Sequence, residues 1–238
     1  MVVATVLSCK FGAASSAIIA LAVIAPDSLE QLDTLRPRAY AVNGNGDSLA
    51  PAALWTTLDT AALAVLNPAA GQTVVRRPGL VGRLEAQVGP LISNPLSIAT
   101  LFAADTLRPA GPTLDSVHVP PQRPDSLSDS IKVQLLTDTA SMRLPSDSLV
   151  PLVGRPVVFT IVRATTLASV TLVKLDTAHA AGVTVDTVAT SALGIATVKV
   201  RLLRGPLPDT VLVTASARRA VRTAVPGSPD TFVVRFLP

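Results

Sequence analysis

Residues Ile131-Lys132-Val133-Gln134-Leu135 alternate strictly between apolar and polar side chains. Successive side chains of a β-strand point to opposite faces of its sheet, so this alternation predicts a strand with one face buried and one in water. Further runs of strand length, each bounded by turn residues, recur along the chain. They span residues 18–24, 32–42, 53–57, 73–75 and 82–88, and then 157–162, 170–175, 183–188, 195–203, 211–217 and 232–236. The pattern predicts an all-β protein.

The aspartates mark where strands begin. All 14 are followed directly by serine or threonine, and in 11 cases the third residue is Leu, Val, Ile or Phe, as in Asp27-Ser28-Leu29. An aspartate can accept a hydrogen bond from the backbone of a turn, after which the β-branched or small residue starts an extended segment. Calcium loops are the alternative, but they place their oxygens at alternate positions. Here the aspartates stand singly apart from Asp125 and Asp129, which favours turns. Asn43-Gly44-Asn45-Gly46 is a further strong hairpin signal.

Composition excludes several classes of protein. The chain has 238 residues, 49% of them hydrophobic but only 15% charged, against about 25% charged in ordinary soluble domains. High hydrophobicity with low net charge argues against disorder. No apolar run reaches the roughly 20 residues of a membrane-spanning helix. Glutamate occurs only at Glu30 and Glu85, whereas β-branched valine and threonine are abundant, and this favours strands over long helices.

The net charge of +4 and the pI of about 9.8 do not indicate nucleic-acid binding. Basic residues are scattered, and no aromatic residues interleave with them as base-stacking surfaces require. The densest group is Arg218, Arg219 and Arg222. These three arginines are candidates for contact with an acidic glycan or lipid headgroups, but an ordinary solvated hairpin is the favoured interpretation, because lipid-binding patches usually need four or more cations.

The N-terminus allows three interpretations. Val6-Leu7-Ser8-Cys9 resembles the lipobox of bacterial lipoproteins, which implies that Cys9 is lipidated and becomes the mature N-terminus. In the second, Lys10 and the apolar residues 13–22 form a signal peptide cleaved after Ala20-Leu21-Ala22. In the third, residues 17–24 are the first strand and Cys9 is an unmodified thiol. We favour the lipoprotein, because one cysteine excludes a disulfide framework and suits an otherwise thiol-free exported chain.

A proline-rich stretch divides the chain. Pro109, Pro112, Pro120, Pro121 and Pro124 crowd residues 103–127, which predicts a semi-rigid linker. The expected organisation is a tether over 1–16, a domain over 17–102, the linker over 103–127 and a second domain over 128–238.

Residues 17–102 resemble a group 2 bacterial immunoglobulin-like domain. The pieces that carry the resemblance are, in order, Ala25-Pro26, residues 35–42, Leu54-Trp55-Thr56, Ala64-Val65, Gly71, Pro78-Gly79 and Gly82-Arg83-Leu84-Glu85-Ala86. The usual "G-e-t" approach to the second strand is missing, and residues 29–34 stand in its place.

Residues 128–238 resemble a group 1 domain of the invasin and intimin type. Here the pieces are Gly154-Arg155-Pro156-Val157-Val158-Phe159, Thr190-Ser191-Ala192-Leu193-Gly194-Ile195-Ala196, Val213-Thr214-Ala215 and a closing strand over 232–236. Together the resemblances imply two immunoglobulin-like antiparallel β-sandwiches in tandem, used as rigid extracytoplasmic modules without shared catalytic residues. In such a sandwich Trp55 is expected in the core, while Gly71, Gly79, Gly82 and Gly194 are expected where the backbone needs positive φ or a close approach.

No catalytic constellation is recognisable. His118 lies in the expected linker and His179 in an expected turn, neither with a partner base, nucleophile or metal ligand nearby in sequence. We therefore predict no catalytic, cofactor or metal residues, although an aspartate pair assembled by folding stays open. The predicted function is a non-enzymatic, exported, lipid-anchored structural or adhesive module of the cell surface. The alternative is a module that binds a glycan or a protein through a sheet face or edge. The sequence leaves the oligomeric state open.

Overall fold

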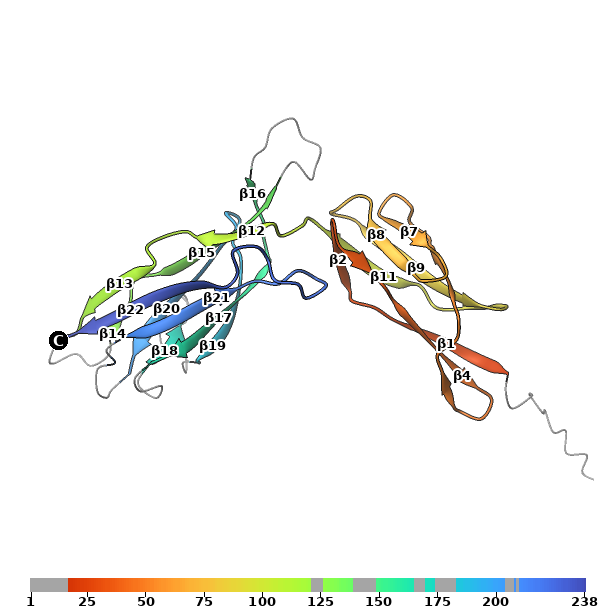
Figure 1. Cartoon of the computed structure of the whole chain (residues 1–238), viewed down its shortest axis with the longest axis horizontal. Helices are drawn as coiled ribbons and strands as arrows, with labels where there is room; N and C mark the ends of the chain where they lie inside the picture. The colour runs from red at the N-terminus through yellow and green to blue at the C-terminus, as the bar shows by residue number, and fades with distance from the viewer. Residues whose placement is uncertain are drawn as a thin grey trace, which may run out of the picture. The chain divides into compact units, whose positions relative to one another are not determined.

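The computed structural model describes residues 17–120, 126–138, 149–164, 170–173, 183–203, 208 and 210–238. The chain divides into two compact units between Leu101 and Phe102. Every regular element within the described residues is a β-strand, which confirms the all-β prediction (Figure 1). The predicted lipidation site Cys9 and the predicted turn residue His179 lie outside the described residues.

The described residues 17–101 of the first unit contain eleven strands. They are β1 (Ile18–Ile24), β2 (Ser28–Glu30), β3 (Thr34–Leu35), β4 (Arg38–Asn43), β5 (Ser48–Leu49), β6 (Leu54–Thr57), β7 (Leu63–Asn67), β8 (Gln72–Val75), β9 (Val81–Val88), β10 (Leu91–Ile92) and β11 (Leu96–Leu101).

The pairing of these strands is that of an immunoglobulin-like sandwich. β1 pairs antiparallel with β4. β3, which directly precedes β4 in the chain, pairs with β8, and β8 pairs with β7. In the other layer, β6 pairs with β9, β9 with β10 and β11, and β11 with β2. The first layer has the A-B-E-D order of an immunoglobulin domain, and the second has its C-F-G order. The opening strand contributes to both layers, because the chain crosses between them at Ala25-Pro26, after β1 and before β2.

Trp55 lies in the core of the first unit, with 4% of its surface exposed, as the sequence predicted. It projects from β6 towards the opposite layer, where a Cβ placed on Gly71 would lie 2.9 Å from its indole ring. Leu63 of β7 makes the matching approach to Gly82 of β9, where an added Cβ would lie at 2.5 Å. Both glycines therefore allow a large side chain of one layer to reach the backbone of the other. Gly79 has φ +80° and Gly194 has φ +69°, so the prediction for all four glycines is confirmed.

The second unit contains the remaining strands. They are β12 (Thr106–Pro109), β13 (Leu114–His118), β14 (Ser126–Leu127), β15 (Ile131–Asp138), β16 (Leu149–Pro151), β17 (Pro156–Arg163), β18 (Val170–Val173), β19 (Val185–Ala189), β20 (Ile195–Leu202), β21 (Val211–Ser216) and β22 (Asp230–Leu237).

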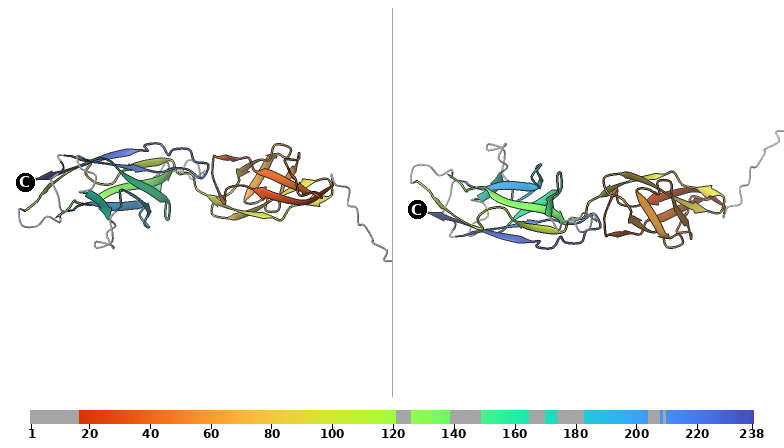
Figure 2. Two further views of the ribbon diagram at one scale, coloured as in Figure 1. Left: turned by 90° about the horizontal axis from the view of Figure 1, so that it is seen from below. Right: turned by 90° about the horizontal axis from the view of Figure 1, so that it is seen from above.

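These strands form two layers around one core, seen edge-on in Figure 2. One layer has the order β12-β15-β20 with β18 beside β20, and the other has the order β13-β22-β21-β17-β19. Phe159 of β17 and Phe232 of β22 are fully buried between them, among valines and leucines from both layers. This is again an immunoglobulin-like order, so two such sandwiches in tandem are confirmed.

The predicted linker over 103–127 is wrong. Its described residues belong to the second sandwich, because β12 pairs antiparallel with β15 and β13 pairs parallel with β22. The prolines have a different role from the one that the sequence suggested. Pro109 ends β12, and Pro112 lies where the chain crosses from one layer to the other. Because proline has no backbone N–H donor, these prolines stand where the pairing of strands in one layer ends. The opening strand of the second unit thus begins before residue 128.

Of the other local predictions, one strand is interrupted, and the aspartate and hairpin signals are confirmed at the positions given below. The predicted strand over 32–42 is interrupted, since Leu32 adopts φ +72° in a turn and Arg36-Pro37 separates β3 from β4. Asp27, Asp33, Asp47 and Asp105 each directly precede a strand, which confirms the strand-start signal at these positions. It is wrong at others, because Asp59 precedes a turn, Asp115 and Asp186 lie within strands, and Asp138 ends one. The expected hairpin at residues 43–46 is also confirmed by the antiparallel pairing of β4 with β5. Asn43 stabilises its turn, because its Oδ1 accepts from the N–H groups of Asn45 and Asp47 at 3.0 and 2.9 Å.

The close approach at Gly71 predicts a specific sensitivity. Gly71→Ala is expected to destabilise the first unit by about 1–3 kcal/mol more than Gly46→Ala, because the new methyl group overpacks the indole of Trp55. Gly46 is a matched control, since its φ of +86° is also positive but nothing lies within 4 Å of an added Cβ. Trp55 is the only tryptophan, so denaturant unfolding followed by its fluorescence reports on the first unit. Equal losses in the two variants would contradict the packing explanation.

Candidate functional site

A two-pronged charged contact in the first unit joins Asp59 to Arg83. The Asp59 carboxylate accepts from Arg83 Nε at 2.8 Å, from its Nη2 at 3.0 Å and from its backbone N–H at 2.9 Å. Asp59 follows β6, and Arg83 lies on the neighbouring strand β9. The two-pronged geometry is the strong form of an arginine–carboxylate pair. The hydrogen bonds from Arg83 lower the pKa of Asp59 below its ordinary value of 3.8. This aspartate is therefore an ionised cross-link between strands and lacks the raised pKa of a general acid.

The second unit has a comparable contact between Asp105 and Arg219. Arg219 Nη2 lies 3.1 Å from Asp105 Oδ1, and its Nε donates to the carbonyl oxygen of Ala104 at 3.0 Å. The other carboxylate oxygen of Asp105 accepts from the backbone N–H of Asp138 at 2.9 Å. Both charged side chains are less than one-fifth exposed. The contact fastens the loop between β21 and β22 (residues 217–229) to the start of β12.

The arginine group predicted from the sequence is therefore divided by the fold. Arg219 is held at Asp105, whereas Arg218 and Arg222 are exposed on the same loop. The Arg218 guanidinium donates to the carbonyl oxygen of Arg222 at 3.0 Å, and Arg222 occupies a turn with φ +68°. Arg218 and Arg222 are thus both exposed, and the Arg218 side chain is bonded to the Arg222 backbone. Sequence could not separate them, because Asp105 lies more than a hundred residues away from Arg219.

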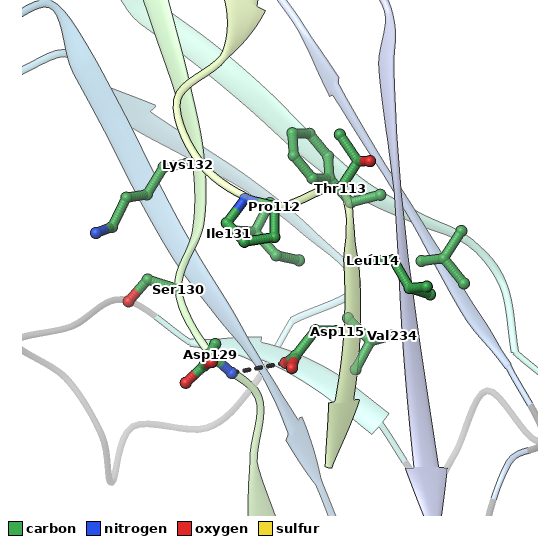
Figure 3. Close-up of a pocket in the computed structure, with 11 residues that line it drawn as sticks. Pro112, Thr113, Leu114, Asp115, Asp129, Ser130, Ile131, Lys132 and Val234 are labelled. Carbon is green, nitrogen blue, oxygen red and sulfur yellow. Dashed lines mark hydrogen bonds between the residues drawn. The ribbon is translucent and has the colours of Figure 1, made fainter.

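A groove of about 280 Å³ lies on the second unit, where the chain crosses between layers (Figure 3). It is lined by three short segments, namely residues 112–115, 129–132 and 232–234. Asp115 Oδ2 accepts from the backbone N–H of Asp129 at 2.8 Å, and Figure 3 shows this bond closing one end of the groove. The Asp115 carboxylate thus holds two strand starts together. The only signal for this pair in the sequence is the shared aspartate–serine motif.

The remaining candidates do not assemble a reactive centre. His118 ends β13 opposite Leu237 and is exposed, so its assignment to a linker is wrong. Burial raises the pKa of Asp230, whose Oδ2 is buried without a hydrogen-bond partner in the described part of the chain. Among the described residues no three His, Cys, Asp or Glu side chains are grouped to hold a metal ion. Within the same residues, no helix is long and apolar enough to cross a membrane.

Comparison with known proteins gives structural likeness only. No protein-family model and no curated protein matches the chain. The D00-D0 domain of intimin is 14% identical, with 92% of this chain and all of that chain covered and a TM-score of 0.32. Domains 4 and 5 of the S-layer protein SbsC are 12% identical, with 93% and 99% covered and a TM-score of 0.31. A glycosyl hydrolase family 2 member from Bacteroides cellulosilyticus is 11% identical, with 87% and 23% covered and a TM-score of 0.30.

The similar structures thus come from intimin, from an S-layer protein and from part of a larger glycosyl hydrolase. At these identities and TM-scores they establish no function for this chain. Its immunoglobulin-like fold is established by the strand pairing of each unit.

The Asp59–Arg83 contact predicts a pH-dependent contribution to stability. Because the pKa of Asp59 is lowered in the folded state, its contribution is complete above the unfolded value of 3.8 and is lost as pH falls through the lower folded value. Asp59→Asn is therefore expected to destabilise the first unit at pH 7, and the difference from wild type should shrink below pH 3.8. Trp55 fluorescence during urea unfolding measures it. Asp27→Asn is the control, since the Asp27 carboxylate accepts only from its neighbour Ser28 among the bonds described. A difference that stays constant down to strongly acidic pH would contradict the role of the carboxylate.

Proposed function

We propose that this chain is a non-enzymatic structural or adhesive module of the cell surface. The observation that carries the proposal is the parallel pairing of the opening strand with the closing strand in each unit. β2 pairs parallel with β11 over three residues, and β13 pairs parallel with β22 over five.

This pairing suits a module that transmits tension. In a parallel pair, the chain enters the first strand and leaves the last strand at opposite ends of the pair. Pulling on the two ends therefore slides the strands past each other and loads the hydrogen bonds between them together, not one after another. In the second unit the pairing is extended at both ends, by Val233 N–H to the Thr113 carbonyl oxygen and by Val119 N–H to the Leu237 carbonyl oxygen, both at 2.8 Å.

The use of charged side chains supports the same function. Asp59, Asp105 and Asp115 each bind a backbone N–H or a guanidinium of a distant segment, so they stabilise the sandwiches. The lowered pKa of Asp59 suits this structural role, whereas a general acid needs a raised pKa.

A binding function is the second candidate, and the exposed pair Arg218 and Arg222 is the observation that favours it. Two guanidinium groups on a loop fastened by Arg219 and Asp105 present donors that fit carboxylate or sulfate groups of an acidic glycan. A protein partner at a sheet edge is the other form of this function.

Export and anchoring belong to the same proposal. The Val6-Leu7-Ser8-Cys9 stretch supports lipidation of Cys9, which would hold the module at the membrane of the cell envelope. We also assign the first unit to the group 2-like class and the second to the group 1-like class, on the motifs quoted above. No nucleic-acid partner and no cofactor form part of the proposed function.

The tension-bearing role predicts a mechanical effect of one hydrogen bond. Val119→Pro removes the N–H that donates to Leu237, whereas Val119→Ala shortens the side chain but keeps that N–H. When the full chain is pulled from its ends in single-molecule force spectroscopy, the proline variant is expected to unfold its second unit at a lower force than the alanine variant. The first unit, which is unchanged, is the internal control. Equal forces for the second unit in the two variants would contradict the role of the parallel pair.

The anchor predicts incorporation of lipid at one residue. In bacteria grown with labelled fatty acid, the wild-type chain is expected to carry label that Cys9→Ser abolishes, because Cys9 is the only cysteine. Ser8→Ala, which keeps a small residue before the cysteine, is the control and should be labelled. If wild type and Cys9→Ser carry equal label, the chain is not a lipoprotein.

A further inference from the structure

Strand β1 is the end strand of its sheet. It pairs antiparallel with β4 along one edge, and no other described strand pairs with its second edge (Figure 1). Every second residue of an edge strand directs its backbone N–H and C=O groups away from the sheet, so this edge is a template for a further strand.

β1 is also more apolar than edge strands usually are, and its side chains are more exposed. Its sequence is Ile-Ile-Ala-Leu-Ala-Val-Ile, yet none of its seven residues is buried, and Ile19 and Ile24 are 57% and 60% exposed. Natural edge strands commonly carry lysine, proline or a bulge that discourages further pairing. β1 has no charge and no proline. Its one irregularity, a register shift between Ile18 and Ala20, leaves Ala20–Ile24 regular.

The sequence of β1 is nearly symmetric about Leu21. Alanine stands on both sides of Leu21, followed outwards by Ile19 and Val23 and then by Ile18 and Ile24. If two copies of the strand pair antiparallel about Leu21, each residue meets one of similar size, and no charged side chain is brought to the new contact. Directly opposite residues lie on the same face of a sheet. The partly covered Leu21 and Val23 of one copy would therefore lie on the same face as the residues opposite them in the other copy. A strand of a different sequence would not make use of this symmetry.

We propose that two copies of this chain associate through β1, antiparallel and centred on Leu21. The three-stranded sheet β1-β4-β5 of each copy then continues into that of the other, related by a two-fold axis. The backbone hydrogen bonds of the new pair, together with the covering of Ile19 by Val23 and of Ile24 by Ile18 of the other copy, provide the attraction. This inference is independent of the proposed function, because it rests on the edge of one sheet alone.

Disulfide trapping tests the register. In a Cys9→Ser background, Leu21→Cys and Ile24→Cys each leave one thiol per chain, so any disulfide joins two chains. In the proposed pair, the two residues 21 have Cβ atoms about 5 Å apart. The two residues 24 are about 20 Å apart, from six residues at roughly 3.3 Å each. Leu21→Cys is therefore expected to form dimers about tenfold faster or more under mild oxidation, because the thiols are held together. Equal rates, or a faster rate for the more exposed Ile24→Cys, would overturn the pairing.

Sedimentation of the full chain tests the association itself. Ala22→Lys places a charge on the exposed face of β1 and is expected to raise the dissociation constant of the dimer about tenfold or more. Ala69→Lys adds the same charge at an exposed turn of the same unit and should leave the constant unchanged. Circular dichroism and Trp55 fluorescence verify that both variants are folded. A wild-type chain that stays monomeric up to about 1 mM, or an equal effect of the two lysines, would refute the proposal.

Discussion

The division of each opening strand between two layers is the constraint on which both sandwiches depend. β1 and β12 pair in one layer, and after a proline-containing crossing β2 and β13 pair in the other. Because the same short stretch of backbone is hydrogen-bonded on both sides of the core, the layers cannot separate without breaking one of these pairings. A chain with a single cysteine cannot form the inter-sheet disulfide of antibody domains, so this crossing is the backbone connection between the layers at that edge.

The packing between the layers follows from the scarcity of aromatic residues. With one tryptophan and five phenylalanines, few side chains are long enough to fill a gap of about 10 Å between sheets. In the first unit, glycine lies opposite the larger side chains, so that these side chains can span the gap: Gly71 lies opposite Trp55, and Gly82 lies opposite Leu63. The layers thus approach closely at these points, and buried leucine and alanine fill the rest of the core.

Local patterns in the sequence predicted the elements better than their assignments to layers. Alternation located β15, and the aspartate motif marked the starts of β2, β3, β5 and β12, because both depend on neighbours in the chain. The proline-rich stretch was mistaken for a linker, because proline at a crossing between layers and proline in a tether look the same without the pairing partners β15 and β22. The contact of Asp105 with Arg219 could not be predicted from the sequence either, because it joins residues near the beginning and near the end of the second sandwich.

These contacts show how the chain uses its few charged residues. Several of the few carboxylates are used between segments: Asp59 holds Arg83, Asp105 holds Arg219, and Asp115 holds the backbone of Asp129. Charge committed to such contacts is not available to protect exposed edges, and β1 carries none at all. In a module with a conventional charged surface, lysine or glutamate on the first strand would keep the sheet closed to further strands. Here these carboxylates connect neighbouring segments of each sandwich, and the edge of β1 carries no charge that would discourage pairing with a second copy.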